Sequence, residues 1–318
     1  MLSYVLNRFK SAIVVLFVVS IITFFVLMII PGNPAELILG TDATPKMIED
    51  LHVAMGLDRP LYQQYLSWLL DLFKLNMGKS YVYGESVKTL IARSLPVTIS
   101  ISVFAMAIAV FIAFFFGMIS AIKKNSIIDY FSRSIMQLGA AIPSFWIGMV
   151  FIVYFGVKLK LFPVSGFVPI NQNFIKFINS IFLPSVVLAI GEVGTLLRII
   201  RSSMLDSLKQ DYMDMAKVKG LGAGKIYIKY ALRGALTAPL TIIGMQFAKL
   251  AGGTVVVETI FALPGLGRLV LTAVEHRDIV LLQGLVMFIT STVIIITLIV
   301  DILVMFLNPR IKSFHQGE

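Results

Sequence analysis

The sequence contains no cysteine and only three histidines, and these shortages exclude several kinds of site. A chain without cysteine has no disulfide framework, no thiolate metal site and no cysteine nucleophile. The histidines His52, His276 and His315 are scattered, and no two stand at the spacing of metal ligands. Neither a His-Glu-x-x-His pattern nor a recognisable Ser/His/Asp arrangement is present. We therefore expect no metal site and no catalytic residues in this chain.

Charged residues are also scarce, which argues against a soluble domain. Asp, Glu, Lys and Arg make up 14% of the 318 residues and apolar residues make up 58%. Soluble domains average about 25% charged and about 45–50% apolar residues. Acidic residues are the rarer sign, and the formal net charge is +10. Because the basic residues adjoin apolar runs, membrane topology explains them better than nucleic-acid binding does. The composition predicts a polytopic membrane protein with no nucleic-acid partner.

Six long apolar runs predict an all-α protein with six transmembrane helices. A helix needs about 20 apolar residues to cross the bilayer core. The runs cover about residues 11–30, 95–122, 130–157, 181–200, 236–257 and 279–307. We expect the first to be a retained span, because it is too long for a signal peptide. Pro31-Gly32-Asn33-Pro34 also follows it, in place of a small-x-small cleavage site.

The charges beside these runs predict which ends lie in the cytoplasm. Arg8 and Lys10 precede the first run, and Lys123-Lys124 follow the second. The stretch 198–233 carries eight basic and three acidic residues. Short loops rich in Lys and Arg remain cytoplasmic, so we expect both termini there. Three lysines around the external loop 161–179 are an exception to this rule.

The chain divides into a first span, an external helical subdomain, a membrane core of five helices and a short cytoplasmic tail. The corresponding ranges are 1–30, 31–94, 95–307 and 308–318, and the core includes a cytoplasmic loop at 201–235. Two amphipathic helices are expected in the external part. The first begins at the N-cap Thr44 and ends at Gly56, and the second opens at Pro60. Tyr62, Tyr65 and Trp68 are expected as aromatic anchors at the membrane interface.

Two prolines stand within or beside the spans. Pro96 is expected at the mouth of the second span. Pro143 lies at mid-depth in the third, where it frees a backbone carbonyl and predicts a kink. The kink could pack against neighbouring helices or face a water-lined path, and the sequence leaves both readings open.

A polar, basic stretch between the fourth and fifth runs organises the rest of the chain. It covers 210–239 and reads QDYMDMAKVKGLGAGKIYIKYALRGALTAP. Apolar residues at i, i+3 and i+4 predict a short helix before the Gly-Leu-Gly-Ala-Gly run and a second helix after it. Lys225, Lys229 and Arg233 give the second helix a basic stripe. The glycines predict a sharp turn between the two helices.

The Gly-Ala-Gly-Lys sequence at 222–225 is not a phosphate-binding loop. That motif requires a glycine five residues before Gly224 and a Ser or Thr after the lysine. Lys219 and Ile226 occupy these positions, and no buried strand precedes them. We expect no nucleotide site in this chain.

The same stretch contains Asp214-Met-Ala216, then Gly220, then Ala231-Leu232-Arg233. That order resembles the cytoplasmic loop of binding-protein-dependent ABC importer permeases, written E-A-A-x-x-x-G. The sequence pattern DY-x-x-x-A-x-x-KGL is similar to that of the dipeptide, oligopeptide, glutathione and nickel importer branch. Met215 stands where the general pattern has alanine and Arg233 where it has proline. These departures weaken the match to the general motif but not to this branch.

The resemblance implies a type I importer permease fold in a bacterial or archaeal inner membrane, without an ATPase site of its own. In that family the loop forms a helix that couples the permease to an ATP-binding subunit. ATP and Mg would therefore be bound by partners, and this chain would bind no cofactor. The implied partners are a second homologous permease, two ATP-binding subunits, an extracytoplasmic solute-binding protein and the lipid bilayer. The residues assigned to coupling are Asp211, Tyr212, Asp214, Ala216, Lys219, Gly220, Leu221 and Arg233.

Other parts of the chain resemble the same branch. They include GLDRPLYQQY and MGKSY in the external segment, the VVE-x-IF-x-x-PGLG and RD-x-x-x-x-QG patterns after the fifth span, and an Asn-Pro-Arg ending. Candidates for an external gate or for contact with the binding protein are Glu258, Pro264, Gly265, Arg277 and Asp278.

Ionisable residues inside the apolar runs should face protein or water, because a charge near the bilayer centre costs a few kcal/mol. Glu192, Lys249 and Asp301 are of this kind, with Gln137 and Gln246 as neutral polar partners. One hypothesis is that Glu192, Lys249 and the two glutamines line the translocation path, where a zwitterionic peptide would meet both charge signs. The alternative is pairing between helices or snorkelling, for Asp301 in particular.

The resemblance implies ATP-driven import of di- or oligopeptides. The same machinery carrying glutathione or a nickel complex is an alternative. A secondary transporter driven by protons through Glu192 or Asp301 is a distant alternative, since such proteins usually contain internal repeats and none is convincing here. An intramembrane enzyme would need a nucleophile or metal ligands at membrane depth. The cargo is not specified by this sequence, because selection rests largely with the separate binding protein.

Overall fold

The protein is all-α, as predicted. The computed structural model describes residues 2–29, 39, 43–54, 56–252 and 254–307, and within these ranges the one β-bridge joins Lys79 and Ser86. The predicted turn at 31–34 and the tail at 308–318 lie outside the described residues. The helices are α1 Leu2–Ile29, α3 Pro45–Ala54, α4 Leu61–Phe73, α5 Val87–Ile122, α6 Ile127–Ala141, α7 Ser144–Phe151, η1 Ile152–Lys158, α8 Phe174–Leu208, α9 Asp211–Val218, α10 Ala223–Lys225, η2 Ile226–Ala231, α11 Leu232–Ala235, α12 Thr237–Gly252, α13 Val255–Ile260, α14 Leu266–Glu275 and α15 Ile279–Leu307.

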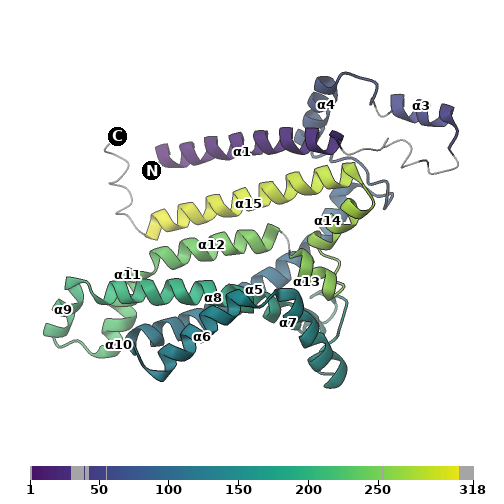
Figure 1. Ribbon diagram of the computed structural model, residues 1–318. Coiled ribbons are helices and arrows are strands. Elements are labelled where there is room, and N and C mark those ends of the chain that lie inside the picture. Colours follow the sequence, from purple (N-terminus) through teal and green to yellow (C-terminus); the bar gives the residue numbers. More distant parts are fainter. Residues whose placement is uncertain (1, 30–38, 40–42, 55, 253, 308–318) are drawn as a thin grey trace.

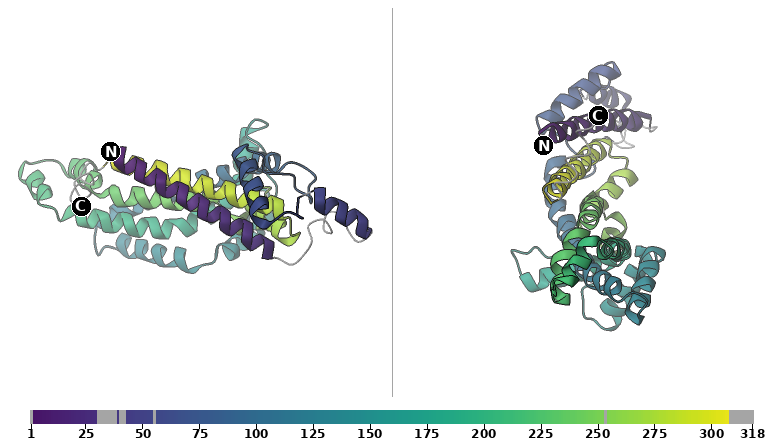
Figure 2. Two further views of the ribbon diagram at one scale, coloured as in Figure 1. Left: turned by 90° about the horizontal axis from the view of Figure 1, so that it is seen from above. Right: turned by 90° about the vertical axis from the view of Figure 1, so that its left-hand side faces the viewer.

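The long helices lie side by side in a row. In Figure 1, α1, α15, α12 and α8 follow one another, and α5 and α6 pack on α8 at the far end of the row. The end-on view in Figure 2 shows that the row is narrow at α15 and broader in the cluster around α8. The short helices α9 and α10 lie at one end of the molecule, and α3, α4, α13 and α14 lie at the other. The layout is that of a polytopic membrane protein with polar segments at both ends.

Among the described residues, four helices are long and apolar enough to cross a membrane, and the number is five if α6 and the bent-off helix of α7 and η1 form one span. The four are α1, α5, α8 and α15, and α15 has the predicted limits of the sixth span. The predicted fifth span is shorter than expected, because α12 ends at Gly252 after 16 residues instead of continuing to Val257. α12 nevertheless lies within the row, between α15 and α8.

The second long helix begins earlier than predicted. α5 starts at Val87 instead of near Leu95, because Ser86 is its N-cap and its Oγ accepts a hydrogen bond of 3.2 Å from the Thr89 N–H. Pro96 therefore lies inside the helix and not at its mouth. The Ser100 hydroxyl donates to the Pro96 carbonyl at 2.6 Å. The predicted start of this helix was wrong because its first turns contain charged residues, which are typical of a loop.

The third predicted span is broken rather than kinked. α6 and the helix formed by α7 and η1 meet at an angle of 100°. The residue before a proline is disfavoured in the helical region, and Ile142 before Pro143 is indeed extended, with φ −90° and ψ 122°. Pro143 then becomes the N-cap of α7. A kink alone would have left one continuous helix across the membrane.

The first external helix agrees with its predicted signals. The Met47 N–H donates to Thr44 Oγ at 3.4 Å, and the chain leaves the helix at Gly56, whose φ is +69°. The second, α4, packs on α1. Tyr65 shares a hydrogen bond of 2.8 Å with Ser20, and its ring meets Phe24 edge to face. Tyr65 is thus buried against α1, whereas Tyr62 is exposed.

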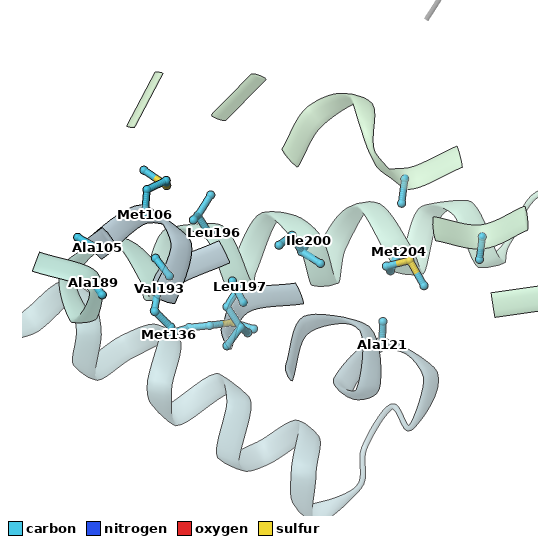
Figure 3. Close-up of a cluster of buried hydrophobic side chains, with 14 of the residues drawn as sticks. Ala105, Met106, Ala121, Met136, Ala189, Val193, Leu196, Leu197, Ile200 and Met204 are labelled. Carbon is cyan, nitrogen blue, oxygen red and sulfur yellow. The ribbon is translucent and has the colours of Figure 1, made fainter. Parts of the chain in front are cut away.

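The largest hydrophobic core lies where α5 and α6 pack against α8. Two glycines allow the close approach: a Cβ on Gly117 would meet Ile200, and a Cβ on Gly139 would meet the backbone carbonyl of Ile190. Figure 3 shows Leu197 of α8 against Met136 of α6 within this cluster. The same cluster continues into α9 and η2, so the membrane core and the segment after α8 share one packed interior.

A buried carboxylate fastens α6 to α8. Asp129 is fully buried, and Arg201 of α8 donates to both of its oxygens at 2.7 and 2.9 Å. Arg133 donates at 2.7 Å and the Asn125 N–H at 2.9 Å. A bidentate guanidinium with two further donors gives the carboxylate the hydrogen bonds that burial requires.

Replacing Asp129 by Asn should destabilise this junction, because Arg201 would lose its charged partner. Hydrogen bonds to charged groups contribute about 1.5–3 kcal/mol each, so we expect a clear fall in the thermal unfolding midpoint of the purified protein. Arg133→Gln is the matched control: the Arg133 side chain is 42% exposed, and Asp129 keeps Arg201 in that variant. Circular dichroism in detergent measures both midpoints. Equal shifts for the two variants would contradict this account.

Candidate functional site

The segment after α8 folds as the predicted helix, turn and helix. α9 has two faces: Met213 and Ala216 are buried in the core, whereas Tyr212, Met215 and Val218 are exposed. The second helix is continuous from α10 through α11, but its middle part, η2, is a π-helix that the sequence pattern did not predict. We call residues 211–235 the coupling segment. One face of it is anchored and the other is open to a partner.

Gly220 makes the turn after α9. Its φ is +70°, its N–H donates to the Lys217 carbonyl at 2.9 Å, and the Leu221 N–H donates to the Ala216 carbonyl at 3.3 Å. These two bonds are the Schellman arrangement, which closes a helix with a left-handed residue and an apolar contact back onto the helix. Leu221 supplies that contact by packing against the core cluster. The predicted glycine turn is confirmed, and Gly220 is its left-handed residue.

A hydroxyl relay ties the coupling segment to the end of α8. The Ser207 hydroxyl donates to the Ala231 carbonyl at 2.8 Å and also lies 2.8 Å from Tyr212 Oη. Because serine has one hydroxyl proton, the tyrosine must donate in the second bond. Gly234 has no Cβ, and one would meet both hydroxyls. One serine thus holds both helices of the segment.

The remaining predicted coupling residues divide between the two faces. Asp211, Lys219 and Arg233 are exposed, and so is Asp214, which pairs with Lys217 at 2.8 Å. The basic stripe of Lys225, Lys229 and Arg233 is exposed as predicted. Ala216 is buried and Leu221 half-buried, so these two anchor the segment and do not present themselves to a partner.

A second feature is a cavity of about 500 Å³ between α7, α8, α12 and α13. Glu192 of α8 and Lys249 of α12 both line it, with Nζ and Oε1 3.5 Å apart. Ser144, Gly191 and Thr254 add small polar or backbone surface, and the rest of the lining is mainly aliphatic. The structure therefore brings together the two opposite charges that the sequence placed at mid-depth.

The other intramembrane polar residues lie elsewhere. Gln137 is exposed on α6, and Gln246 has a buried Oε1 without a hydrogen-bond partner in the described part of the chain; neither lines the cavity. Asp301 pairs with Arg8 of α1 at 3.2 Å. Its role between helices agrees with the pairing alternative.

At the opposite end, Glu258 is fully buried and organises the loop between α13 and α14. The hydroxyls of Thr98 and Thr254 donate to Oε1 at 2.7 Å each, and the Arg268 N–H donates to Oε2 at 3.0 Å. A Cβ on Gly265 would collide with this carboxylate, which explains the glycine. Pro264, next to it, is exposed. Glu258 therefore holds the loop from inside, and Pro264 is its outward residue.

Asp278 is also fully buried and joins the start of α15 to the external segment. Its carboxylate accepts hydrogen bonds from Ser80 Oγ at 2.5 Å and from the Leu281 N–H at 3.0 Å. Tyr81 donates to the Arg277 carbonyl at 2.5 Å and accepts from the Ile279 N–H. Burial raises the pKa of Tyr81 to about 12, and the Asp278 charge acts in the same direction. The phenol therefore stays neutral and keeps its proton for the carbonyl.

The burial of Glu258 and Asp278 bears on their predicted role as contacts for a binding protein. Neither carboxylate reaches the surface in this structure, so a direct contact of these side chains with a binding protein is not available here. Pro264 and Arg277 are exposed beside them. A gate formed by the loop as a whole remains a proposal.

Comparison with known proteins decides the family. Residues 113–313 match the family described as binding-protein-dependent transport system inner membrane component, and residues 1–102 match the N-terminal part of such membrane components. The chain belongs to this family. It is a multi-pass inner membrane component, and the all-α polytopic fold agrees with that membership.

The relatives of this inner membrane component align over nearly the whole chain. A Brucella abortus protein named as a peptide transport system permease is 38% identical over 312 residues, covering 98% of this chain and 99% of the relative. The di/tripeptide transport system permease of Pseudomonas aeruginosa is 33% identical, covering 99% of this chain and the whole relative. The dipeptide transport system permease of Alkalihalophilus pseudofirmus is 34% identical, covering 98% of this chain and the whole relative.

Among solved structures, an amino acid ABC transporter crystallised with histidines matches with a TM-score of 0.42 and 16% identity. The alignment covers 73% of this chain and 95% of that chain. A likeness this slight carries no argument about the fold or function of the inner membrane component.

Sequence reasoning missed several residues that hold the functional segments. Asp129, Ser207 and Tyr81 were not singled out, although each makes long-range hydrogen bonds. Only Asp129 had a local signal, because Ser126 is the N-cap of α6 and Asp129 follows three residues later. The others depend on partners far away in the chain, which no local pattern reveals.

Replacing Gly220 by Val should uncouple the inner membrane component from its ATPase. A Cβ at this position meets nothing within 4 Å, so the cost is backbone strain of roughly 1–2 kcal/mol confined to the turn. We expect the variant to fold in the membrane but to lose most solute-stimulated ATP hydrolysis in reconstituted vesicles. Gly220→Asn is the control, because Asn tolerates the left-handed conformation. Unchanged stimulation in the Val variant, or equal losses in both, would contradict this prediction.

Proposed function

We propose that this chain is the permease subunit of an ATP-driven importer that moves di- or oligopeptides across the inner membrane. The observation that carries the proposal is the full-length similarity, at 33–38% identity, to proteins named as peptide and dipeptide transport permeases. The two-faced coupling segment supports it, because a permease without an ATPase site needs a surface on which a partner can act. Import of glutathione or a nickel complex by the same machinery is the alternative that the test below separates.

Energy would reach the permease through the exposed face of the coupling segment. Two partner subunits bind ATP and Mg, and their closure on ATP would move α9 through contacts with Asp211, Tyr212, Asp214 and their neighbours. The Ser207–Tyr212 hydrogen bond and the buried Met213 join α9 to α8, so a displacement of α9 would become a displacement of a 35-residue helix. α8 also carries Glu192, and the motion would therefore reach the cavity.

Two further partners follow from the exposed surfaces. A thin row of helices encloses at most part of a path, and a second homologous permease would complete it. Apolar side chains such as Ile13 and Phe17 on α1 are exposed and would face lipid. At the other end of the molecule, the loop with Pro264 and the exposed Arg277 would receive the solute-loaded binding protein.

We infer that the coupling segment lies in the cytoplasm. The first turns of α1, the last turns of α15 and the helices α9 and α10 lie at the same end of the molecule in Figure 1. Arg8, Arg201 and the basic stripe belong to that end, which is the distribution expected of cytoplasmic segments. Both termini would then be cytoplasmic, with α3 and α4 outside.

The cargo can be tested through the binding protein that purifies with this chain. Its thermal midpoint should rise with dialanine or a longer peptide, and cells producing the complete transporter should accumulate that peptide only when this chain is present. A binding protein that is stabilised by glutathione or a nickel complex and by no peptide would overturn the proposal. Uptake without this chain would overturn it as well.

A single cysteine can test the orientation, since the chain has none of its own. Gly222→Cys places a thiol on an exposed turn where a Cβ meets nothing within 4 Å, so the fold should be undisturbed. We expect a membrane-impermeant maleimide to label it only after the cells are opened. Glu49→Cys, at an exposed position on α3, serves as the external control and should be labelled in intact cells. Labelling of the Gly222→Cys variant in intact cells would show that the orientation is the reverse of the one proposed.

A further inference from the structure

Four carboxylates are buried in the described part of the chain, and one differs from the other three. Asp129, Glu258 and Asp278 each accept at least three hydrogen bonds from protein donors. Glu192 accepts one, from Lys249, and its length of 3.5 Å is far above the 2.7–2.9 Å usual for charged partners. Glu192 is therefore the buried carboxylate whose hydrogen-bonding capacity is largely unused.

An unsaturated carboxylate is costly unless something else solvates it. Removing a charged group from water without partners costs more than any single long contact returns. Glu192 lines the 500 Å³ cavity, and its second oxygen makes no hydrogen bond to another described residue. The free capacity of Glu192 is thus directed to the cavity, where it can accept from a donor that is not part of this chain.

The cavity has the size and chemistry of a small-ligand site. Ligand pockets are typically about 300–1,000 Å³, mostly apolar, with a few polar groups that fix orientation. Here the polar groups are of both signs: the Glu192 side chain is 9% exposed, and Lys249 opposite it is 77% exposed on a long flexible stem. The lysine can move away from the carboxylate without leaving the cavity wall.

We propose that this cavity binds the two charged ends of a zwitterionic peptide, the ammonium group at Glu192 and the carboxylate at Lys249. The inference rests on the proposed function and names the chemistry by which the same path recognises its cargo. In the empty state the two side chains face each other across 3.5 Å. A peptide replaces that single contact by one ion pair at each end, so the pair opens when cargo enters and closes when it leaves.

The alternative is that Glu192 and Lys249 form only a structural link between α8 and α12. A structural link predicts that either substitution has the same consequence for every ligand. A site for both ends of a peptide predicts that each substitution weakens the binding of different ligands, because each side chain binds a different end of the peptide.

The test uses the purified complex of permease and ATPase subunits without binding protein, and saturation-transfer NMR with three ligands. These are dialanine, N-propionyl-alanine, which lacks the amino group, and dialanine amide, which lacks the carboxylate. We expect the wild type to bind dialanine about tenfold more tightly than either analogue. Glu192→Gln should lose the preference over propionyl-alanine alone, and Lys249→Gln the preference over the amide alone.

Two variants complete the design. Glu85→Gln removes a half-exposed carboxylate that pairs with Arg93 outside the cavity, and should leave all three affinities unchanged. Gly191→Leu adds bulk to the cavity wall at a position where a Cβ meets nothing within 4 Å, and should weaken all three ligands while the thermal midpoint is kept.

Equal losses for all ligands in Glu192→Gln and Lys249→Gln, or wild-type binding in both, would overturn the inference. Peptide uptake by the wild-type transporter measured in parallel keeps the two proposals apart. Unchanged uptake in both variants would contradict the charged site but leave peptide import standing. Absence of peptide uptake by the wild type would contradict the proposed function itself.

Discussion

The packing of α5 along α8 is the contact on which the rest of the structure depends. Gly117 brings the two helices close, and α6, α12 and η2 then pack on the same helix. α8 has to be long, because it carries the cavity residue Glu192, the junction residue Arg201 and the relay residue Ser207 at successive depths. A single rigid element thus connects the two ends of the molecule.

The buried polar groups divide the molecule into parts that are held and a part that is open. Asp129 holds α6 and α8 together near the coupling segment, while Glu258 and Asp278 hold the loops at the opposite end of the molecule, all with saturated hydrogen bonding. Between them, at mid-depth, Glu192 and Lys249 have a single long contact. Rigid ends and a loosely paired middle are what a path needs if a motion imposed at one end is to alter access at the other.

The sequence was sufficient for the features that local patterns control. The limits of α15, the helix cap at Thr44 and the turn at Gly220 followed from apolar length, capping residues and glycine. It was wrong at two helix boundaries, because Pro143 breaks its span completely and α12 ends at Gly252, and it failed again where distant partners decide. The burial of Glu258 likewise depends on Thr98, which lies in another helix, so an acidic residue in an external loop looked like a surface contact. The division into four parts and the role of the gate stay predictions.

The position of α1 has a consequence for how the protein is made. α1 is synthesised long before α15, yet the two helices pack against each other in the row, and Arg8 meets Asp301 there. At about 5–20 residues per second, synthesis of the intervening chain takes on the order of tens of seconds. During that time α1 stays in the bilayer without α15, and the contact between the two helices forms only after α15 has been synthesised.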